Sequence, residues 1–227
     1  AFATGRTAQL FPACVNARTL AAILIEPYNH MKLFSLLSFL SFLCLFSFGQ
    51  TMQTPKDYLN FPGPVTVAKT KYNFAWSSHP NENYYKHEYI PSTNTLEKYK
   101  SMVLVEVLVG EYNPSDIAGA KVAELKKLKE NNPVVNYNIF QKNGEIILDF
   151  LITDNAPNGN VSIIERNIYR YKSAIDKNGK KYLILFGISE RGYGNEGKAF
   201  LANLKNNKNV LLNEMAKQAM PEVEITD

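Results

Sequence analysis

The sequence has 227 residues, of which 45% are hydrophobic and 20% are charged, and its formal net charge at pH 7 is +4. A chain of this length can bury a sizeable hydrophobic core. The 25 basic and 21 acidic side chains nearly balance, so the charge gives no argument for a nucleic acid or an anionic membrane surface as a partner.

Residues 31–49 have the layout of a secretory signal peptide. Lys32 follows Met31, and an uncharged run of mainly Leu, Phe and Ser over residues 33–48 ends shortly before Gln50. The apolar run is shorter than the roughly 20 residues that a membrane-spanning helix needs. We therefore expect a soluble exported protein, periplasmic or secreted, with no membrane span after cleavage.

The first 49 residues contain both cysteines, Cys14 and Cys44. Residues 1–30 are interpreted as an upstream or non-native leader that is disordered, with a transit-type presequence as the alternative. Residues 50–63 are expected to form an extended linker, and residues 64–227 a single α+β domain. The exported part then has no thiol, no disulfide and no cysteine-based metal site.

The part after residue 49 is rich in Asn, Lys, Tyr and Ile, and the predicted signal ends in Phe48-Gly49-Gln50. These features resemble those of exported proteins from Bacteroidota-type bacteria. The resemblance covers only the signal and the composition, so it implies export and carries no activity.

Alternating apolar and polar residues predict the strands of the domain, and residues 77–83 are rich in turn-forming residues. A short helical piece is expected near residues 96–100. A longer helix opens at Pro114-Ser115-Asp116, where Ser115 or Asp116 can cap it, and the last helix spans 196–220. Strands are expected over residues 66–76, 84–90, 102–109, 134–140, 145–152, 161–171 and 181–189.

These elements predict an α+β fold with one twisted antiparallel sheet of six to seven strands and two packed helices. The last four strands must be antiparallel because their connections are too short for parallel crossovers. The order of the elements resembles that of the PsbP and Mog1 type of sandwich. A curved cystatin-like or NTF2-like sheet is the alternative.

No metal, cofactor or catalytic motif is recognisable after residue 49. His79 and His87 lack the ligand spacing of a zinc site. The glycines match neither a phosphate-binding loop nor a dinucleotide fingerprint, and no nucleophile elbow is present. The sequence therefore predicts no metal, no cofactor and no catalytic residues.

Asp149 lies in the middle of a predicted strand, where an unpaired carboxylate is costly to bury. Arg166 and Arg170 share one face of the next strand, and either can lie opposite or diagonal to Asp149. We expect a cross-strand ion pair. The alternative is a polar cluster that binds an anionic ligand through its arginines.

Residues 189–195 join the last strand to the last helix and are the first place to look for a pocket. Glu190, Arg191 and Tyr193 are the candidate ligand-binding residues there, together with Asp149, Arg166 and Arg170.

The leading hypothesis is an exported, non-enzymatic binding or accessory protein of the periplasm or cell surface. Its partner would be a small molecule, a glycan or another envelope protein, because tyrosine-rich strands can present aromatic faces to such ligands. One alternative is an extracytoplasmic hydrolase, and another is a structural envelope protein. The hydrolase would combine Asp149, Glu165 or Glu190 with Arg166, Arg191 or His87.

Overall fold

The structure is a computed structural model, and it describes residues 54–155 and 160–226. The described residues all belong to one compact unit, Met52–Asp227. The predicted leader over residues 1–30, the predicted signal peptide over residues 31–49 and both cysteines lie outside the described residues.

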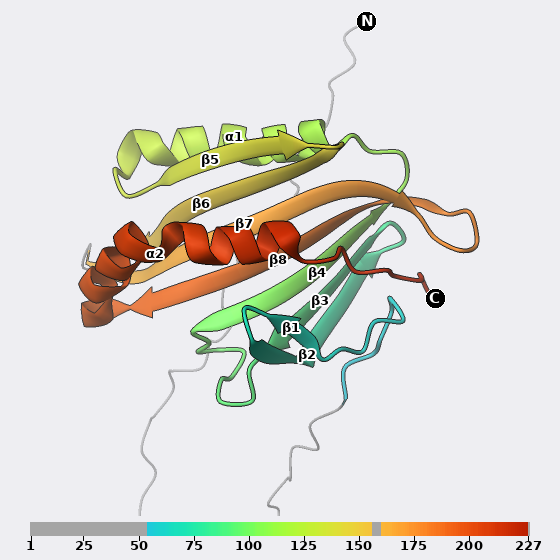
Figure 1. Ribbon diagram of the computed structural model, residues 1–227, viewed down its shortest axis with the longest axis horizontal. Helices are drawn as coiled ribbons and strands as arrows, with labels where there is room; N and C mark the ends of the chain where they lie inside the picture. Colours follow the sequence, from blue (N-terminus) through green and yellow to red (C-terminus); the bar gives the residue numbers. More distant parts are fainter. Residues whose placement is uncertain (1–53, 156–159, 227) are drawn as a thin grey trace, which may run out of the picture. The chain divides into compact units, whose positions relative to one another are not determined.

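A single antiparallel sheet of eight strands dominates the structure, in the order β1-β2-β3-β4-β8-β7-β6-β5 (Figure 1). The sheet curls into a half-barrel. The central pair, β4 and β8, joins the N-terminal hairpins to the C-terminal meander. The strands are β1 (Val65–Val67), β2 (Thr70–Asn81), β3 (Tyr84–Ile90), β4 (Ser101–Val109), β5 (Asn136–Lys142), β6 (Glu145–Asn155), β7 (Val161–Ile175) and β8 (Lys181–Tyr193).

The expectation of six to seven strands is wrong, because the stretch predicted as one strand over residues 66–76 is a tight hairpin. The chain reverses at Ala68 and Lys69, whose φ angles are 47° and 67°, so that Val65–Val67 pairs with the start of β2. Residues other than glycine rarely adopt positive φ. An Ala-Lys pair therefore gives no turn signal in the sequence, and β1 was missed.

Two predicted loops are also shorter than expected. Strand β2 continues to Asn81, so the turn expected over residues 77–83 is reduced to two residues. Strand β8 continues to Tyr193, so most of the loop expected over residues 189–195 is part of the sheet. Residues 96–100, expected to be helical, form an irregular loop without a helix.

Two helices cover opposite faces of the sheet (Figure 1). Helix α1 (Pro114–Asn131) begins after Asn113, whose side chain accepts a hydrogen bond from the backbone N of Ser115 at 2.9 Å. The cap is thus Asn113 and not Ser115 or Asp116. Helix α2 (Gly197–Lys217) follows β8 through the 3-10 turn η1 (Gly194–Glu196), and it is continuous through its asparagine-rich middle.

The sheet has a separate hydrophobic core on each face. On β4, Val103, Val105 and Val107 point to the α2 side, whereas Leu104 packs in the cluster on the α1 side. Successive side chains of a strand point to opposite faces, so a strand covered on both sides must be apolar at nearly every position. The continuous apolar sequences of β4 and β8 follow from this requirement.

The two ends of the described chain lie together over the α2-side core. The backbone N of Glu224 donates to the Leu59 carbonyl at 2.9 Å, and the backbone N of Thr226 donates to the Tyr58 carbonyl at 2.9 Å. Leu59, Val223 and Ile225 are buried in that core. We call residues 57–61 and 223–226 together the terminal strap.

Candidate functional site

The six predicted ligand-binding residues fall on the two faces of the sheet. Asp149, Arg166, Arg170 and Glu190 point toward helix α2, because β6, β7 and β8 pair so that these positions share a face. Arg191 and Tyr193 alternate with Glu190 along β8 and point to the other face. The six residues, predicted as one ligand-binding set, therefore form two separate clusters in the structure.

Asp149 and Arg166 form the expected ion pair between β6 and β7. Arg166 Nε lies 2.9 Å from Asp149 Oδ1, and Nη2 lies 3.2 Å from Oδ2, with side chains that are almost fully buried. Nη2 of Arg166 also donates to the Lys208 carbonyl of α2 at 2.6 Å. The pair thus connects the sheet to the middle of α2.

Arg170 holds the end of helix α2. Its Nη1 donates to the carbonyls of Met215 and Gln218 at 2.8 and 2.5 Å, and its Nη2 lies 2.6 Å from a Glu145 carboxylate oxygen. A cation at the C-terminal end of a helix is favoured by the helix dipole. The contacts of Arg166 and Arg170 therefore favour a structural role over an anion-binding one.

Glu190 lies at the edge of the same cluster, 3.9 Å from Arg166 Nη1. Burial raises the pKa of Glu190, the Arg166 guanidinium opposes that rise, and the Asp149 carboxylate adds to it. Two carboxylates therefore share one arginine beneath α2.

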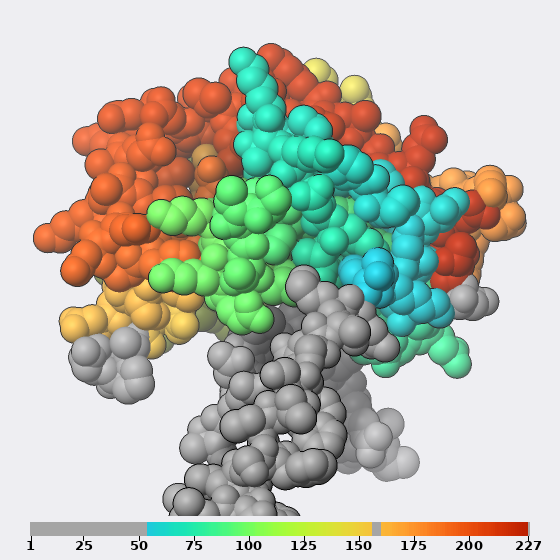
Figure 2. Space-filling model, turned by 90° about the horizontal axis from the view of Figure 1, so that it is seen from below, coloured from blue at the N-terminus to red at the C-terminus, as the bar shows by residue number. Residues whose placement is uncertain are grey.

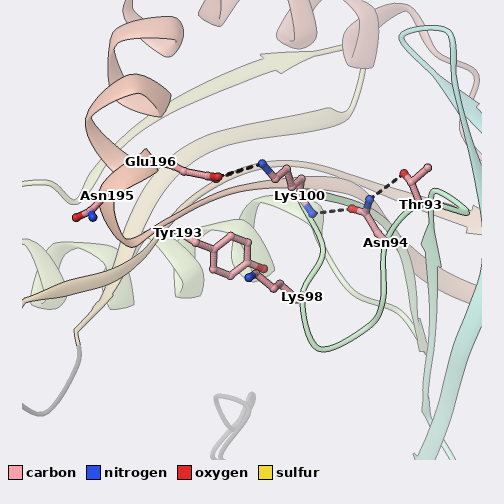
Figure 3. A pocket seen from close by; sticks show the side chains of 7 residues that line it. All are labelled: Thr93, Asn94, Lys98, Lys100, Tyr193, Asn195 and Glu196. Carbon is pink, nitrogen blue, oxygen red and sulfur yellow. Dashed lines mark hydrogen bonds and ion pairs between the residues drawn. The ribbon is translucent and has the colours of Figure 1, made fainter.

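An open hollow of about 600 Å³ lies on the structure where the loop before β4 meets the end of β8 (Figure 3). Figure 2 shows the green surface of this loop beside the orange-red surface that leads into α2. We call this the Tyr193 hollow. Its lining residues are Thr93, Asn94, Lys98, Lys100, Tyr193, Asn195 and Glu196.

Hydrogen bonds hold the loop that forms one wall of the Tyr193 hollow. The side chain of Asn94 accepts a hydrogen bond from the Lys100 backbone N at 2.6 Å. The backbone N of Arg191 donates to the Lys100 carbonyl at 2.9 Å, which extends the β4–β8 pairing by one residue. The loop is thereby fixed against the end of β8.

Tyr193 forms the aromatic wall of the hollow. Its hydroxyl donates to the Tyr99 carbonyl at 2.7 Å, which sets the position of the ring. Gly194 then takes a φ of 47° and turns the chain into η1, which places Asn195 and Glu196 at the rim.

The charges of the hollow are mixed. Lys100 Nζ lies 3.2 Å from a Glu196 carboxylate oxygen, and both side chains are largely exposed. Lys98 Nζ lies 5.8 Å from the centre of the Tyr193 ring, and within residues 54–155 and 160–226 it has no ion-pair partner. The hollow thus presents one unpaired ammonium group beside an aromatic ring.

Arg191 supports the hollow from the side. It forms an ion pair with Glu165, and its guanidinium lies 4.0 Å from the centre of the Tyr99 ring. Desolvation lowers the pKa of Arg191, but Glu165, Tyr99 and Tyr193 together outweigh this effect and leave the pKa raised. Arg191 therefore stays charged and holds Tyr99, the residue whose carbonyl anchors Tyr193.

The residues of the hydrolase alternative fall into separate groups, and the one that gathers two carboxylates, Asp149 and Glu190 around Arg166, lies beneath helix α2. Asp149 and Glu190 lie on the α2 side of the sheet, whereas Glu165 lies on the other side beside Arg191. Nor is any group of three or more His, Cys, Asp and Glu side chains placed to hold a metal ion in the part of the chain that the structure describes.

His87 is fully buried on β3 and uncharged. Its Nε2 accepts a hydrogen bond from the Tyr58 backbone N at 3.2 Å, so Nδ1 carries the proton and donates to the Tyr89 hydroxyl at 3.1 Å. That hydroxyl donates to the Phe61 carbonyl at 2.6 Å. Burial lowers the pKa of His87 to about 4, although the nearby Asp57 carboxylate opposes the shift. These contacts attach the terminal strap to the sheet.

Tyr193 is the only one of the six predicted residues that lines the hollow; Arg191 lies next to it. The sequence does not mark Asn94, Lys98 or Lys100 as site residues; Lys98 and Lys100 fall in the stretch 96–100, for which a helical piece is expected. The clustered Pro, Ser, Thr and Asn residues over 91–95 are typical of a turn and were the one available signal.

Residues 59–220 match a protein-family model, which is most of the chain and includes both walls of the Tyr193 hollow. The chain belongs to this family. No curated protein and no solved structure matches the chain at a significant level. The expected resemblances to PsbP, Mog1, cystatin-like and NTF2-like folds therefore receive no support from known structures.

Over residues 54–155 and 160–226, no helix is both long enough and apolar enough to cross a bilayer.

Proposed function

We propose that the protein is an exported, non-enzymatic binding protein of the periplasm or cell surface, and that its ligand is a glycan held in the Tyr193 hollow. The observation that carries the proposal is the composition of the hollow: one aromatic ring beside side chains that both donate and accept hydrogen bonds. The predicted signal peptide over residues 31–49 supports export.

Hydroxyl groups match this lining because each can donate one hydrogen bond and accept others. Lys98 and Asn195 offer donors, and Glu196 and Thr93 offer acceptors. The Tyr193 ring adds an apolar face against which the C–H groups of a sugar ring can pack. A polyhydroxylated ligand can therefore use both kinds of partner.

A phosphate is a poorer match. The Glu196 carboxylate lies at the rim and pairs with Lys100, so only Lys98 remains to attract an anion. A carboxylate beside a bound phosphate is repulsive. The mixed charges thus favour a neutral or weakly acidic glycan.

The test is a screen of the purified protein against soluble oligosaccharides, followed by titration of any hit with three variants. We expect Tyr193→Ala and Lys98→Met each to weaken binding at least tenfold. Tyr112→Ala is the control, because this tyrosine is also solvent-accessible but lies outside the hollow. Its affinity should equal that of the wild type.

Three outcomes separate the hypotheses. Binding that is unchanged by Tyr193→Ala would move the ligand site elsewhere. Cleavage of the bound oligosaccharide would favour the hydrolase alternative. The absence of binding across the whole screen would contradict the glycan proposal and leave a structural envelope protein as the better hypothesis.

A further inference from the structure

Strand β5 forms one edge of the sheet, at the opposite end from β1 (Figure 1). No strand lies beyond it among the described residues. Ile139 and Phe140, in its middle, are 50% and 46% exposed. Residues 136–141 carry no charge. The edge therefore presents an uncharged, partly apolar strand to its surroundings.

The two edges of the sheet are protected very differently. Strand β1 has three residues, with Pro64 before it and Lys69 in the turn after it. Short strands, proline and lysine are the usual means of preventing edge-to-edge pairing. Strand β5 has seven residues, no proline and an unbroken register with β6, and its one charged residue is Lys142 at the end. Only the β5 edge is left open to pairing.

The turn between β5 and β6 determines which backbone groups of β5 point outward. Asn143 and Gly144 form a two-residue loop with φ angles of 52° and 77°, as in a type I′ hairpin. In such a hairpin Lys142 and Glu145 are a hydrogen-bonded pair, so alternate residues from Lys142 backward face β6. The N–H and C=O groups of Tyr137, Ile139 and Gln141 therefore face outward.

A hydrogen bond supports this assignment. The backbone N of Tyr137 donates to the Asn136 side-chain oxygen at 3.0 Å. An N–H group that faced β6 would instead donate to a backbone carbonyl of β6.

We infer that β5 pairs antiparallel with β5 of a second copy of this chain, with Ile139 of each copy opposite Ile139 of the other. In this register Tyr137 lies opposite Gln141 of the second copy. The three pairs use all six outward backbone groups of each copy once the Tyr137 N–H exchanges its bond to Asn136 Oδ1 for one to the second copy. The pattern is self-complementary about a two-fold axis, which is the symmetry of most dimers. It joins the two eight-stranded sheets into one.

The side chains agree with this register. Lys142 lies opposite the uncharged Asn136 of the second copy, so no two charged residues of β5 itself face each other across the new pair. Helix α1 packs beside β5 and carries Leu128, which is 43% exposed. A single strand pair buries little surface, so we expect a weak dimer that forms with rising concentration.

Sedimentation velocity over a hundredfold range of protein concentration tests the association. We expect the sedimentation coefficient of the wild type to rise with concentration. Ile139→Lys places two like charges opposite each other and should raise the concentration needed for dimers at least tenfold. Val210→Lys is the matched control, because Val210 is an exposed apolar residue on α2, and it should behave as the wild type. A wild type that stays monomeric, or an equal effect of both variants, would overturn the inference.

Disulfide cross-linking tests the register, in a background with Cys14→Ser and Cys44→Ser. Two Ile139→Cys chains would have their Cα atoms about 5.5 Å apart, within the range of a disulfide. Two Gln141→Cys chains would be offset by four residues, or about 13 Å. We expect Ile139→Cys to form dimers on oxidation at least tenfold faster than Gln141→Cys. Equal rates would overturn the register, and no cross-linking of either would indicate that β5 pairs with a different extended segment or with none.

Discussion

A single residue, His87, makes the stability of the protein depend on pH. Its pKa of about 4 in the folded chain lies below the ordinary value of 6.5, because a fully buried imidazole resists charging. The unfolded chain therefore binds the proton more readily. His87 contributes fully to the free energy of unfolding above pH 6.5, and this contribution is lost as the pH falls toward 4. At pH 5 the loss is about 2 kcal/mol.

Urea denaturation at pH 7 and pH 5 measures this effect. We expect His87→Gln to remove about 2 kcal/mol of the pH dependence of the free energy of unfolding, because an amide can accept from the Tyr58 N–H without titrating. His79→Gln on the neighbouring strand β2 is the control and should leave most of that dependence intact. An identical pH dependence in all three proteins would show that His87 is not the residue responsible.

The candidate residues show how far single positions can be predicted. Strand alternation placed Arg166 within reach of Asp149, and the structure contains that ion pair. The third partner, the Lys208 carbonyl, lies 42 residues away on a helix, and no local pattern encodes which carbonyl of a helix meets a given strand. The sequence therefore indicated a polar cluster but could not reveal that α2 covers it.

Buried charged side chains of the sheet bind helix α2, because Arg166 and Arg170 donate to its carbonyl groups. The stability of this contact therefore depends on each buried charge keeping its partner. Removing one partner of a buried ion pair leaves an uncompensated charge and costs about 3–5 kcal/mol, whereas replacing both with apolar residues is often nearly neutral. We therefore expect Arg166→Met to lose about 3–5 kcal/mol of unfolding free energy because Asp149 stays buried.

The double variant Asp149→Leu with Arg166→Met should recover most of that loss in the same urea titration. Lys172→Met is the control. Lys172 lies on β7, like Arg166, but its charge is exposed and pairs with Glu145 of β6, so its removal should cost less than about 1 kcal/mol of unfolding free energy. The single variant Asp149→Leu completes the comparison. If the double variant loses as much unfolding free energy as Asp149→Leu and Arg166→Met lose together, the ion pair does not couple β6 to β7.

The elements themselves divide into predictable and unpredictable ones for a physical reason. Strands β3, β4 and β6 to β8 have strong alternating or continuous apolar patterns, since they face one core or two. Strand β1 has only three residues and a turn at Ala68-Lys69 that depends on tertiary contacts. The Tyr193 hollow likewise needs the Arg191–Lys100 hydrogen bond, which joins residues 91 positions apart. Such long-range contacts leave no periodic trace in a sequence.

Across the whole molecule, the terminal strap closes the larger core. Val223 and Ile225 are 6% and 8% exposed and pack over β3, β4 and β8 with Leu59, although they lie beyond the residues that match the family. Burying an aliphatic side chain contributes about 1.5–3 kcal/mol. Deleting residues 221–226 should therefore cost about 3–5 kcal/mol and also expose Leu59.

The truncated protein can be compared with the double variant Val223→Ala with Ile225→Ala by urea denaturation. We expect the double variant to lose about half or more of the free energy that the truncation loses, because it keeps the backbone hydrogen bonds to Leu59 and Tyr58. Glu222→Ala, an exposed neighbour, is the control and should change stability little. A truncated protein as stable as the wild type would show that the core on the α2 side closes without residues 223–226.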